Sequence, residues 1–332
     1  MSSLLEVPLA RRLHRLPVVR LLHGRAAQRA WSWDLRDQLT REWWPQGITW
    51  AGERLLVSWY SRRGAGSRVS VVDLATRRYA HVPLLTPEGE PLRVHAGGLA
   101  WGDGWLYVAA TARGFWTLHV DDLVVGRECT WRARAIHRPT LPGSDEPFRW
   151  SFLDLAPLRW SSSEERQRRE GVETTTPSPV EVRASRPLLA GEYGRGTKTT
   201  RLARLTIIDG QPRGDLEPLG AGPSGMQGVT TYDDGLVVST SAGPWRRGGL
   251  RVLTGRSTPH AADVRWAAAP AASTGATAGA RTAADGRDVR PPPSPGRLVG
   301  PVGVEDVTRD PLGRLWTVGE HPARRSIVRL NG

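Results

Sequence analysis

Short runs in which apolar and polar residues alternate recur along most of the chain. Segments that resemble one another begin near residues 47, 98, 152, 228 and 306. Each contains three such runs, rich in β-branched or aromatic residues and separated by turns such as Gly-Asp-Gly and Asp-Asp-Gly. Alternation with a period of two residues is typical of β-strands, so each segment predicts a small antiparallel sheet.

A fourth, weaker run follows each of the first four segments, at residues 79–85, 131–137, 215–219 and 264–268. The two longest spacings between segments each contain one insertion, at about 161–186 and 269–296. Without these insertions the repeat is about 50 residues long, which is the length of a four-stranded propeller blade.

The fifth segment ends after its third run, and Arg29–Leu35 lies where a strand could complete it. We therefore predict an all-β fold, a five-bladed β-propeller over 29–332 closed by pairing an N-terminal strand with the C-terminal blade. The alternatives are six blades, with a degenerate one in 1–45 or 161–186, and an open array. Residues 1–28 are predicted to be a partly disordered extension, and the Pro-rich tract 269–296 to be disordered.

The basic composition changes this picture little. The formal net charge is +13, but Lys198 is the only lysine among 46 basic residues, so the excess is arginine. Such a bias is typical of GC-rich coding sequences, and no basic run is interleaved with aromatic residues. We therefore expect no nucleic-acid partner. The single cysteine, Cys129, excludes an internal disulfide and a cysteine-based zinc site.

No apolar stretch is long enough to predict a transmembrane helix. Arginine and histidine interrupt the apolar positions of the first 25 residues, so no signal peptide is predicted. The expectation is a cytoplasmic monomer, or a secreted protein if the start site is misassigned.

Several motifs carry a family resemblance over most of residues 43–330. These are QGIT, LLVSWY, HAGGLAW, SFLDL, LLAGEYGRG, MQGVTT, VEDVT and EHPARR. They resemble a family of actinobacterial β-propeller-like proteins. The resemblance implies the propeller fold and no particular chemistry. Members of that family often look secreted, whereas this sequence lacks a clear signal peptide.

Propeller geometry selects the candidate site. The starts of the innermost strands and the loops after the second strands meet at one end of the axis, where ligands usually bind. That end is predicted to collect polar residues into an axial pocket for a small polar ligand or a protein partner. The candidates are Gln46, Tyr60, His95, Arg113, Glu192, Tyr193, Arg195, Gln227, Glu305, Asp306, Glu320 and His321. Turns at the opposite end show no convergent chemistry.

Three further interpretations stay open. A divalent cation held by carboxylates and imidazoles would make a lactonase-like or esterase-like hydrolase, or a lyase. Its candidate ligands are Glu192, Glu305, Asp306, Glu320, His95 and His321. Alternatively, the same glutamates pair with arginines and join the blades. Trp43 and Trp44 would instead form a stacking platform for a carbohydrate. No H-E-x-x-H or G-x-S-x-G motif names a reaction.

Overall fold

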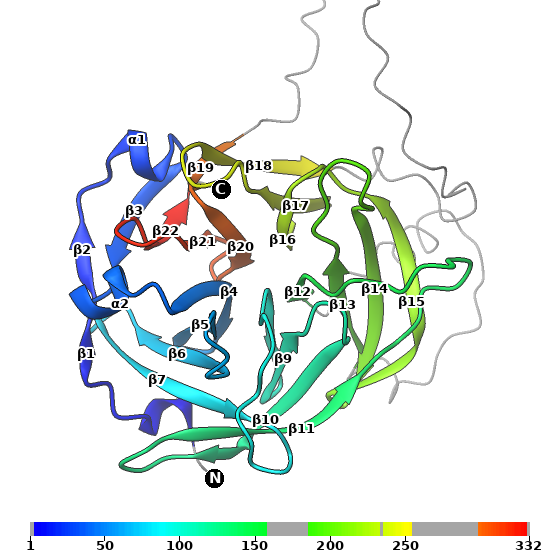
Figure 1. The fold of residues 1–332 in the computed structure, drawn as a ribbon, viewed down its shortest axis with the longest axis horizontal. Helices are drawn as coiled ribbons and strands as arrows, with labels where there is room; N and C mark the ends of the chain where they lie inside the picture. Colours follow the sequence, from blue (N-terminus) through cyan, green and yellow to red (C-terminus); the bar gives the residue numbers. More distant parts are fainter. Residues whose placement is uncertain (1–2, 158–184, 233–234, 254–297, 331–332) are drawn as a thin grey trace, which may run out of the picture.

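The strands form groups of four in the computed structural model, which describes residues 3–157, 185–232, 235–253 and 298–330 (Figure 1). The first group is β4 (Trp43–Ala51), β5 (Arg54–Ser61), β6 (Ser67–Asp73) and β7 (Arg78–Leu85). The second is β8 (Leu99–Gly102), β9 (Trp105–Ala109), β10 (Phe115–Val124) and β11 (Thr130–His137). A short parallel pairing of β7 with β11 joins the two groups edge to edge.

The later groups repeat this order. The third is β12 (Phe152–Leu155), β13 (Ser185–Gly191), β14 (Arg201–Ile208) and β15 (Gln211–Ala221). The fourth is β16 (Met226–Tyr232), β17 (Gly235–Thr240), β18 (Arg247–Leu253) and β19 (Leu298–Val302). The last is β20 (Val304–Arg309), β21 (Leu315–Gly319) and β22 (Ser326–Leu330), completed by β3 (Ala27–Ser32) from the other end of the sequence.

The groups surround a common centre, with β4, β12, β16 and β20 among the elements nearest to it (Figure 1). The first strands form a ring of contacts: β4 with β8, β8 with β12, β12 with β16, β16 with β20, and β20 with β4. The fold is therefore all-β and propeller-like, as the repeats predict.

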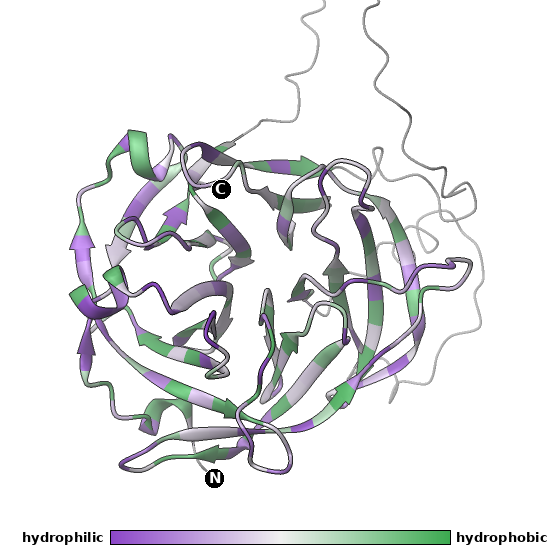
Figure 2. Ribbon diagram, viewed as in Figure 1, coloured by the Kyte–Doolittle hydropathy of each residue, from purple (hydrophilic) through white to green (hydrophobic). Residues whose placement is uncertain are grey.

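Alternate residues of a strand pack in different cores, because both faces of a group are buried. In β5, Leu55, Val57 and Trp59 pack in the core that contains Trp316 and Ile327 of the last group. Leu56, between them, packs in the core shared with the second group, against residues that include Leu99 and Val108. Hydrophobic residues accordingly recur along the strands of every group (Figure 2). Each group is held by the apolar surface of its two neighbours.

Residues 3–28, assigned above to an extension, carry short elements along the outer edge (Figure 1). Here β1 (Arg11–Arg12) pairs with β7, and β2 (His14–Leu16) pairs with β3. The helices are η1 (Leu4–Glu6), α1 (Arg20–His23) and, beyond β3, α2 (Leu35–Leu39). No described helix has the length and apolar composition that a bilayer-spanning helix needs.

Asp37 of α2 anchors this outer segment to the first group. The residue is 3% exposed. Its carboxylate accepts hydrogen bonds from Tyr79 at 2.7 Å and Arg68 at 3.0 Å, and from Arg11 at 3.2 Å. His81 Nε2 lies 2.8 Å from the same carboxylate. These partners lower the pKa of Asp37 although burial opposes ionisation.

Two sequence predictions need correction at the insertions. The fourth strand of the fourth group is β19, not 264–268, which lies outside the described residues together with the tract 269–296. The insertion placed at 161–186 ends earlier than predicted, because Ser185 and Arg186 belong to β13. Most of that insertion also lies outside the described residues.

Candidate functional site

One end of the axis holds a cavity of about 340 Å³, built from the starts of the inner strands and the loops beside them. Half of the twelve predicted candidates line it, namely Gln46, His95, Tyr193, Gln227, Glu305 and Glu320. Thr111 and Ser151, which occupy the same kinds of position in their repeats, also line the cavity, together with Arg149 and Lys198, which the sequence argument did not select. The predicted convergence of polar residues at this end is therefore present.

The carboxyl groups of Glu305 and Glu320 are hydrogen-bonded to each other inside this cavity. Glu305 is the second residue of β20 and is 3% exposed, and Glu320 follows β21. Burial raises the pKa of Glu305 well above its usual value, and the neighbouring Glu320 carboxylate raises it further. Burial also raises the pKa of Glu320. Both raised pKa values favour the protonated carboxyl, so the pair holds a proton more readily than two isolated glutamates would.

Two glutamine amides fix the orientation of this acid pair. Gln46 donates from Nε2 to Glu320 Oε2 at 3.0 Å, and Gln227 donates from Nε2 to Glu305 Oε1 at 3.2 Å. Both glutamines occupy the same repeat position, the first residue of QGIT and QGVT, and Glu305 occupies it in the last group. The repeat itself thus places the acid pair and its two amide donors around one point.

Arginines make the surroundings of the pair positive. Arg195 interacts electrostatically with Glu305, and Arg62 interacts with Glu320. Burial lowers the pKa of His95, and the charge of Arg62 lowers it further. The His95 ring also packs against the Tyr60 ring, with centroids 4.3 Å apart. His95 is therefore a neutral imidazole at neutral pH, and Tyr60 supports it.

Glu192 is not available to a ligand. It is fully buried, and Arg201 donates to both of its carboxylate oxygens, at 2.6 and 2.8 Å. The Thr199 hydroxyl donates to Oε2 at 2.6 Å. These donors lower the pKa of Glu192 against the effect of burial. Its prediction as a pocket or metal residue is corrected to a structural pair between β13 and β14.

Asp306 is likewise structural. Its Oδ2 accepts the backbone N–H groups of Ile48 at 3.1 Å and Leu99 at 3.3 Å, and its Oδ1 accepts that of Val307 at 3.0 Å. The residue is fully buried and does not line the cavity. Burial raises its pKa well above the usual value, and the backbone donors oppose that effect. Asp306 joins three inner strands instead of contacting a ligand.

The remaining predicted residues lie around the cavity and not in its lining. Arg113 is exposed, and exposed Arg195 donates to the Ser241 carbonyl at 3.0 Å. His321 packs edge-on against Trp44, and its Nε2 lies 3.6 Å from Glu320 Oε1. Trp44 and Trp43 do not form an open platform, because the guanidinium groups of Arg62 and Arg68 lie over their rings at 3.6 and 4.2 Å.

The predicted metal site is not assembled. Within the part of the chain that the structure describes, no three His, Cys, Asp or Glu side chains lie close enough together to hold a metal ion. Glu192 and Asp306 are used by protein donors, as described above, whereas Glu305 and Glu320 bond to each other. The divalent-cation hypothesis for these six residues is therefore not supported by their arrangement.

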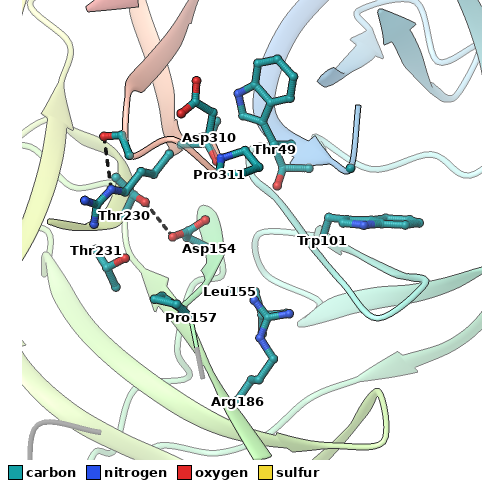
Figure 3. Close-up of a pocket in the computed structure, with 15 residues that line it drawn as sticks. Thr49, Trp101, Asp154, Leu155, Pro157, Arg186, Thr230, Thr231, Asp310 and Pro311 are labelled. Carbon is teal, nitrogen blue, oxygen red and sulfur yellow. Dashed lines mark hydrogen bonds between the residues drawn. The ribbon is translucent and has the colours of Figure 1, made fainter. Parts of the chain in front are cut away.

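A second cavity, of about 370 Å³, lies at the opposite end of the inner strands, where no convergent chemistry was predicted (Figure 3). Its lining includes Asp154, whose carboxylate accepts the Thr230 hydroxyl at 2.8 Å. Asp154 occupies the position held by Thr49, Thr230 and Thr308 in other repeats. An acidic residue inside the apolar run SFLDL was the signal that could have found this cavity.

Tight packing of the inner strands lies between the two cavities. A Cβ atom on Gly98 would lie 2.3 Å from the Leu153 nitrogen and 2.4 Å from the Phe152 Cα. A Cβ on Gly47 would lie 2.8 Å from the Gly98 carbonyl carbon, and one on Gly228 would lie 2.5 Å from Asp306 Oδ1. These positions admit glycine because neighbouring backbones touch there. The two ends of the axis thus form separate sites.

No family model and no curated protein matches the sequence. Among solved structures, the chain is similar to a glucose dehydrogenase, with 14% identity, 98% of this chain and 97% of that chain covered, and a TM-score of 0.38. It is similar to a thermostable family-43 glycoside hydrolase at 11% identity, 92% and 91% coverage and a TM-score of 0.43. It is also similar to a GH43_1 enzyme from Xanthomonas citri, at 12% identity, with 98% of this chain and 92% of that chain covered and a TM-score of 0.36. At these values the similarity identifies neither a family nor an activity.

Proposed function

We propose that the chain is a five-bladed propeller whose cavity around Glu305 and Glu320 binds a small polar ligand bearing hydroxyl groups and one anionic group. The ring of contacts among β4, β8, β12, β16 and β20 supports the blade number. The hydrogen-bonded carboxyl pair, reached from solvent through a polar cavity, carries the functional proposal.

The charges of the lining favour an anion-bearing ligand. Arg149 and Lys198 line the cavity as cations, and Arg62 and Arg195 act on it from its rim. The carboxyl pair contributes a single negative charge while it retains its proton. The cations therefore outnumber the acid charge, and an anionic group of the ligand would lower the electrostatic energy of the cavity.

The acid pair and its glutamines favour hydroxyl groups on the rest of the ligand. A carboxylate accepts hydrogen bonds, a protonated carboxyl also donates, and each glutamine amide does both. A hydroxyl group matches this mixture because it too donates and accepts. Hydroxy acids and sugar phosphates combine hydroxyl and anionic groups in one small molecule.

The test is a thermal-shift and calorimetric screen of hydroxy acids and sugar phosphates against the protein and Glu320→Gln. We expect an anionic compound to raise the melting temperature of the protein. Glu320→Gln should weaken its binding at least tenfold, because an amide replaces the carboxylate that accepts hydrogen bonds from the hydroxyl groups of the ligand. Glu217→Gln is the matched control, since Glu217 is exposed and pairs with Arg204 on an outer strand. No stabilising compound, or equal binding by Glu320→Gln, would overturn the proposal.

A second candidate function is metal-independent hydrolysis of a lactone or ester. The observation that favours it is the same acid pair, which places a proton donor and an acceptor in contact, as general acid–base catalysis requires. Assays of lactone and ester hydrolysis with and without a chelator test it. Activity that survives chelation and falls at least 100-fold in Glu305→Gln is expected. Activity abolished by chelation would restore the metal-dependent alternative.

A further inference from the structure

The cavity at the Asp154 end is bounded by equivalent positions of the inner strands. The fourth residue of each repeat motif is Thr49, Ala100, Asp154, Thr230 and Thr308. All but Ala100 line the cavity. Because the repeats are related around the axis, hydroxyl groups approach the cavity from several strands at one depth. This arrangement is independent of the acid pair at the other end.

The hydroxyl groups are largely uncommitted. Thr230 donates to Asp154, but the hydroxyls of Thr49, Thr231 and Thr308 form no hydrogen bond with any described residue. These three threonines are only 2–3% exposed. Their hydroxyl oxygens are not among the described buried atoms that lack a partner, so they are accessible from the cavity. The cavity therefore presents donors and acceptors that a bound molecule could satisfy.

The charges of this lining balance. Arg186 and Arg309 are the basic residues, and Asp154 and Asp310 are the acidic ones. Asp310 is already bonded to Arg314 at 2.6 Å and to the Trp316 indole at 2.9 Å. Counted as formal charges, these two basic and two acidic side chains cancel. A neutral ligand fits it better than an anion or a cation.

Two indole rings supply apolar surface beside the polar groups. Trp50 and Trp101 occupy the next repeat position, in adjacent groups, and both are partly exposed. Figure 3 shows Trp101 and Arg186 across the cavity from Thr230 and Thr231. Indole rings offer a flat apolar face. A sugar ring combines a face of C–H groups with a rim of hydroxyls, and so matches both features.

From these observations we infer that the Asp154 cavity is a second binding site, which takes a neutral sugar residue. Asp154 and the threonines bond to ring hydroxyls, Arg186 donates from the opposite wall, and the C–H face of the ring packs on an indole. A volume of about 370 Å³ suits one or two sugar rings and not a long chain.

The experiment is titration of the full chain with glucose, xylose, maltose and cellobiose, followed by tryptophan fluorescence and calorimetry. We expect saturable binding of at least one sugar. Asp154→Asn should weaken it at least tenfold, and Trp101→Ala should abolish it. Trp245→Ala is the matched tryptophan control, because Trp245 is 79% exposed and does not line the cavity. Circular dichroism and melting temperatures verify that each variant folds.

The outcome separates this site from the Glu305 cavity. Glu320→Gln should leave sugar binding unchanged, whereas it should weaken binding of the anionic ligand proposed above. Absence of saturable binding by the unmodified protein would overturn the inference. So would binding that Asp154→Asn and Trp101→Ala, both folded, leave intact. Loss of sugar binding in Glu320→Gln alone would place the sugar at the other end of the axis and equally overturn it.

Discussion

The Asp306 carboxylate accepts the backbone N–H of Ile48 at 3.1 Å, across 258 positions of sequence. It thereby ties β20 to β4, and through Leu99 also to the adjoining second group. Three of the other repeats hold glycine at this position, namely Gly47, Gly98 and Gly228, and the third repeat holds Phe152. The Asp306 side chain thus provides acceptors for backbone N–H groups where the ring joins its first and last groups.

Removing this carboxylate should destabilise the fold. Asp306→Ala leaves buried N–H groups of two inner strands unpaired, so the free energy of unfolding should fall by about 2–4 kcal/mol. Asp306→Asn keeps one acceptor oxygen and should lose less. Urea denaturation of both variants measures the difference. Equal stability of the alanine variant and the parent would contradict the role assigned to Asp306.

The close approach of the inner strands predicts an intolerant glycine. Gly98→Ala would place a Cβ 2.3 Å from the Leu153 nitrogen, so neighbouring backbone must move. We expect a loss of at least about 2 kcal/mol in the free energy of unfolding. Gly126 is the control, since a Cβ there meets nothing within 4 Å. A Gly98→Ala variant as stable as Gly126→Ala would show that the strands are less tightly packed.

The buried Asp154 carboxyl should make the stability of the fold depend on pH. Burial raises its pKa from 3.8 to about 7, so the folded chain binds more protons than the unfolded chain between these values. The stability of the parent protein should therefore decline, through this group, as the pH rises from 4 to 7. Above pH 7 the buried carboxylate is ionised and its full cost applies.

Asp154→Asn removes this dependence while keeping an acceptor for the Thr230 hydroxyl. Its stability relative to the parent should increase with pH, toward a limit of roughly 4 kcal/mol above pH 8. Paired urea titrations at pH 5 and pH 8 measure the change. A difference between the two proteins that is the same at both pH values would rule out the raised pKa.

The contribution of Asp37 to stability should depend on pH in the opposite sense. Asp37→Ala should cost about 3–5 kcal/mol, because it leaves Arg68 and Tyr79 buried without their shared acceptor. Its pKa is lowered in the folded chain, so its contribution is present above pH 4 and is lost as the pH falls below that value. Asp122→Ala, which removes an exposed pair with Arg134, should cost less than about 1 kcal/mol. Thermal melts from pH 2 to 7 compare the two variants, and similar losses would argue against the buried anchor.

The sequence predicts the repeat better than the contacts within it. Short apolar runs such as LLVSW identify strands because both faces of each group are buried, so local pattern and tertiary packing agree. The fourth strand of the fourth group was misplaced, because 264–268 and Leu298–Val302 both carry short apolar runs. Local pattern alone does not decide which of two such runs joins a sheet.

The sequence predicted which residues lie at the candidate site, but not which groups they bond to. Equivalence among repeats placed Gln46, Gln227 and Glu305 together, because it depends only on the repeat. The same logic selected Glu192, whose bonds to Arg201 depend on the pairing register of β13 with β14. The register of the strands and the rotamer of the side chain decide whether a charged group faces a ligand or a neighbouring residue. Neither can be predicted from a single sequence.

The pairing of β3 with β22 also constrains how the chain is made. Trp31 and Ile327 are register partners from opposite ends of the sequence. A ribosome exposes β3 well before β22, so β3 stays without this partner until the residues between them have emerged. The last contact of the ring therefore has very high sequence separation, which slows folding. Until that contact forms, the edges of β3 and β22 are open to pairing with another nascent chain.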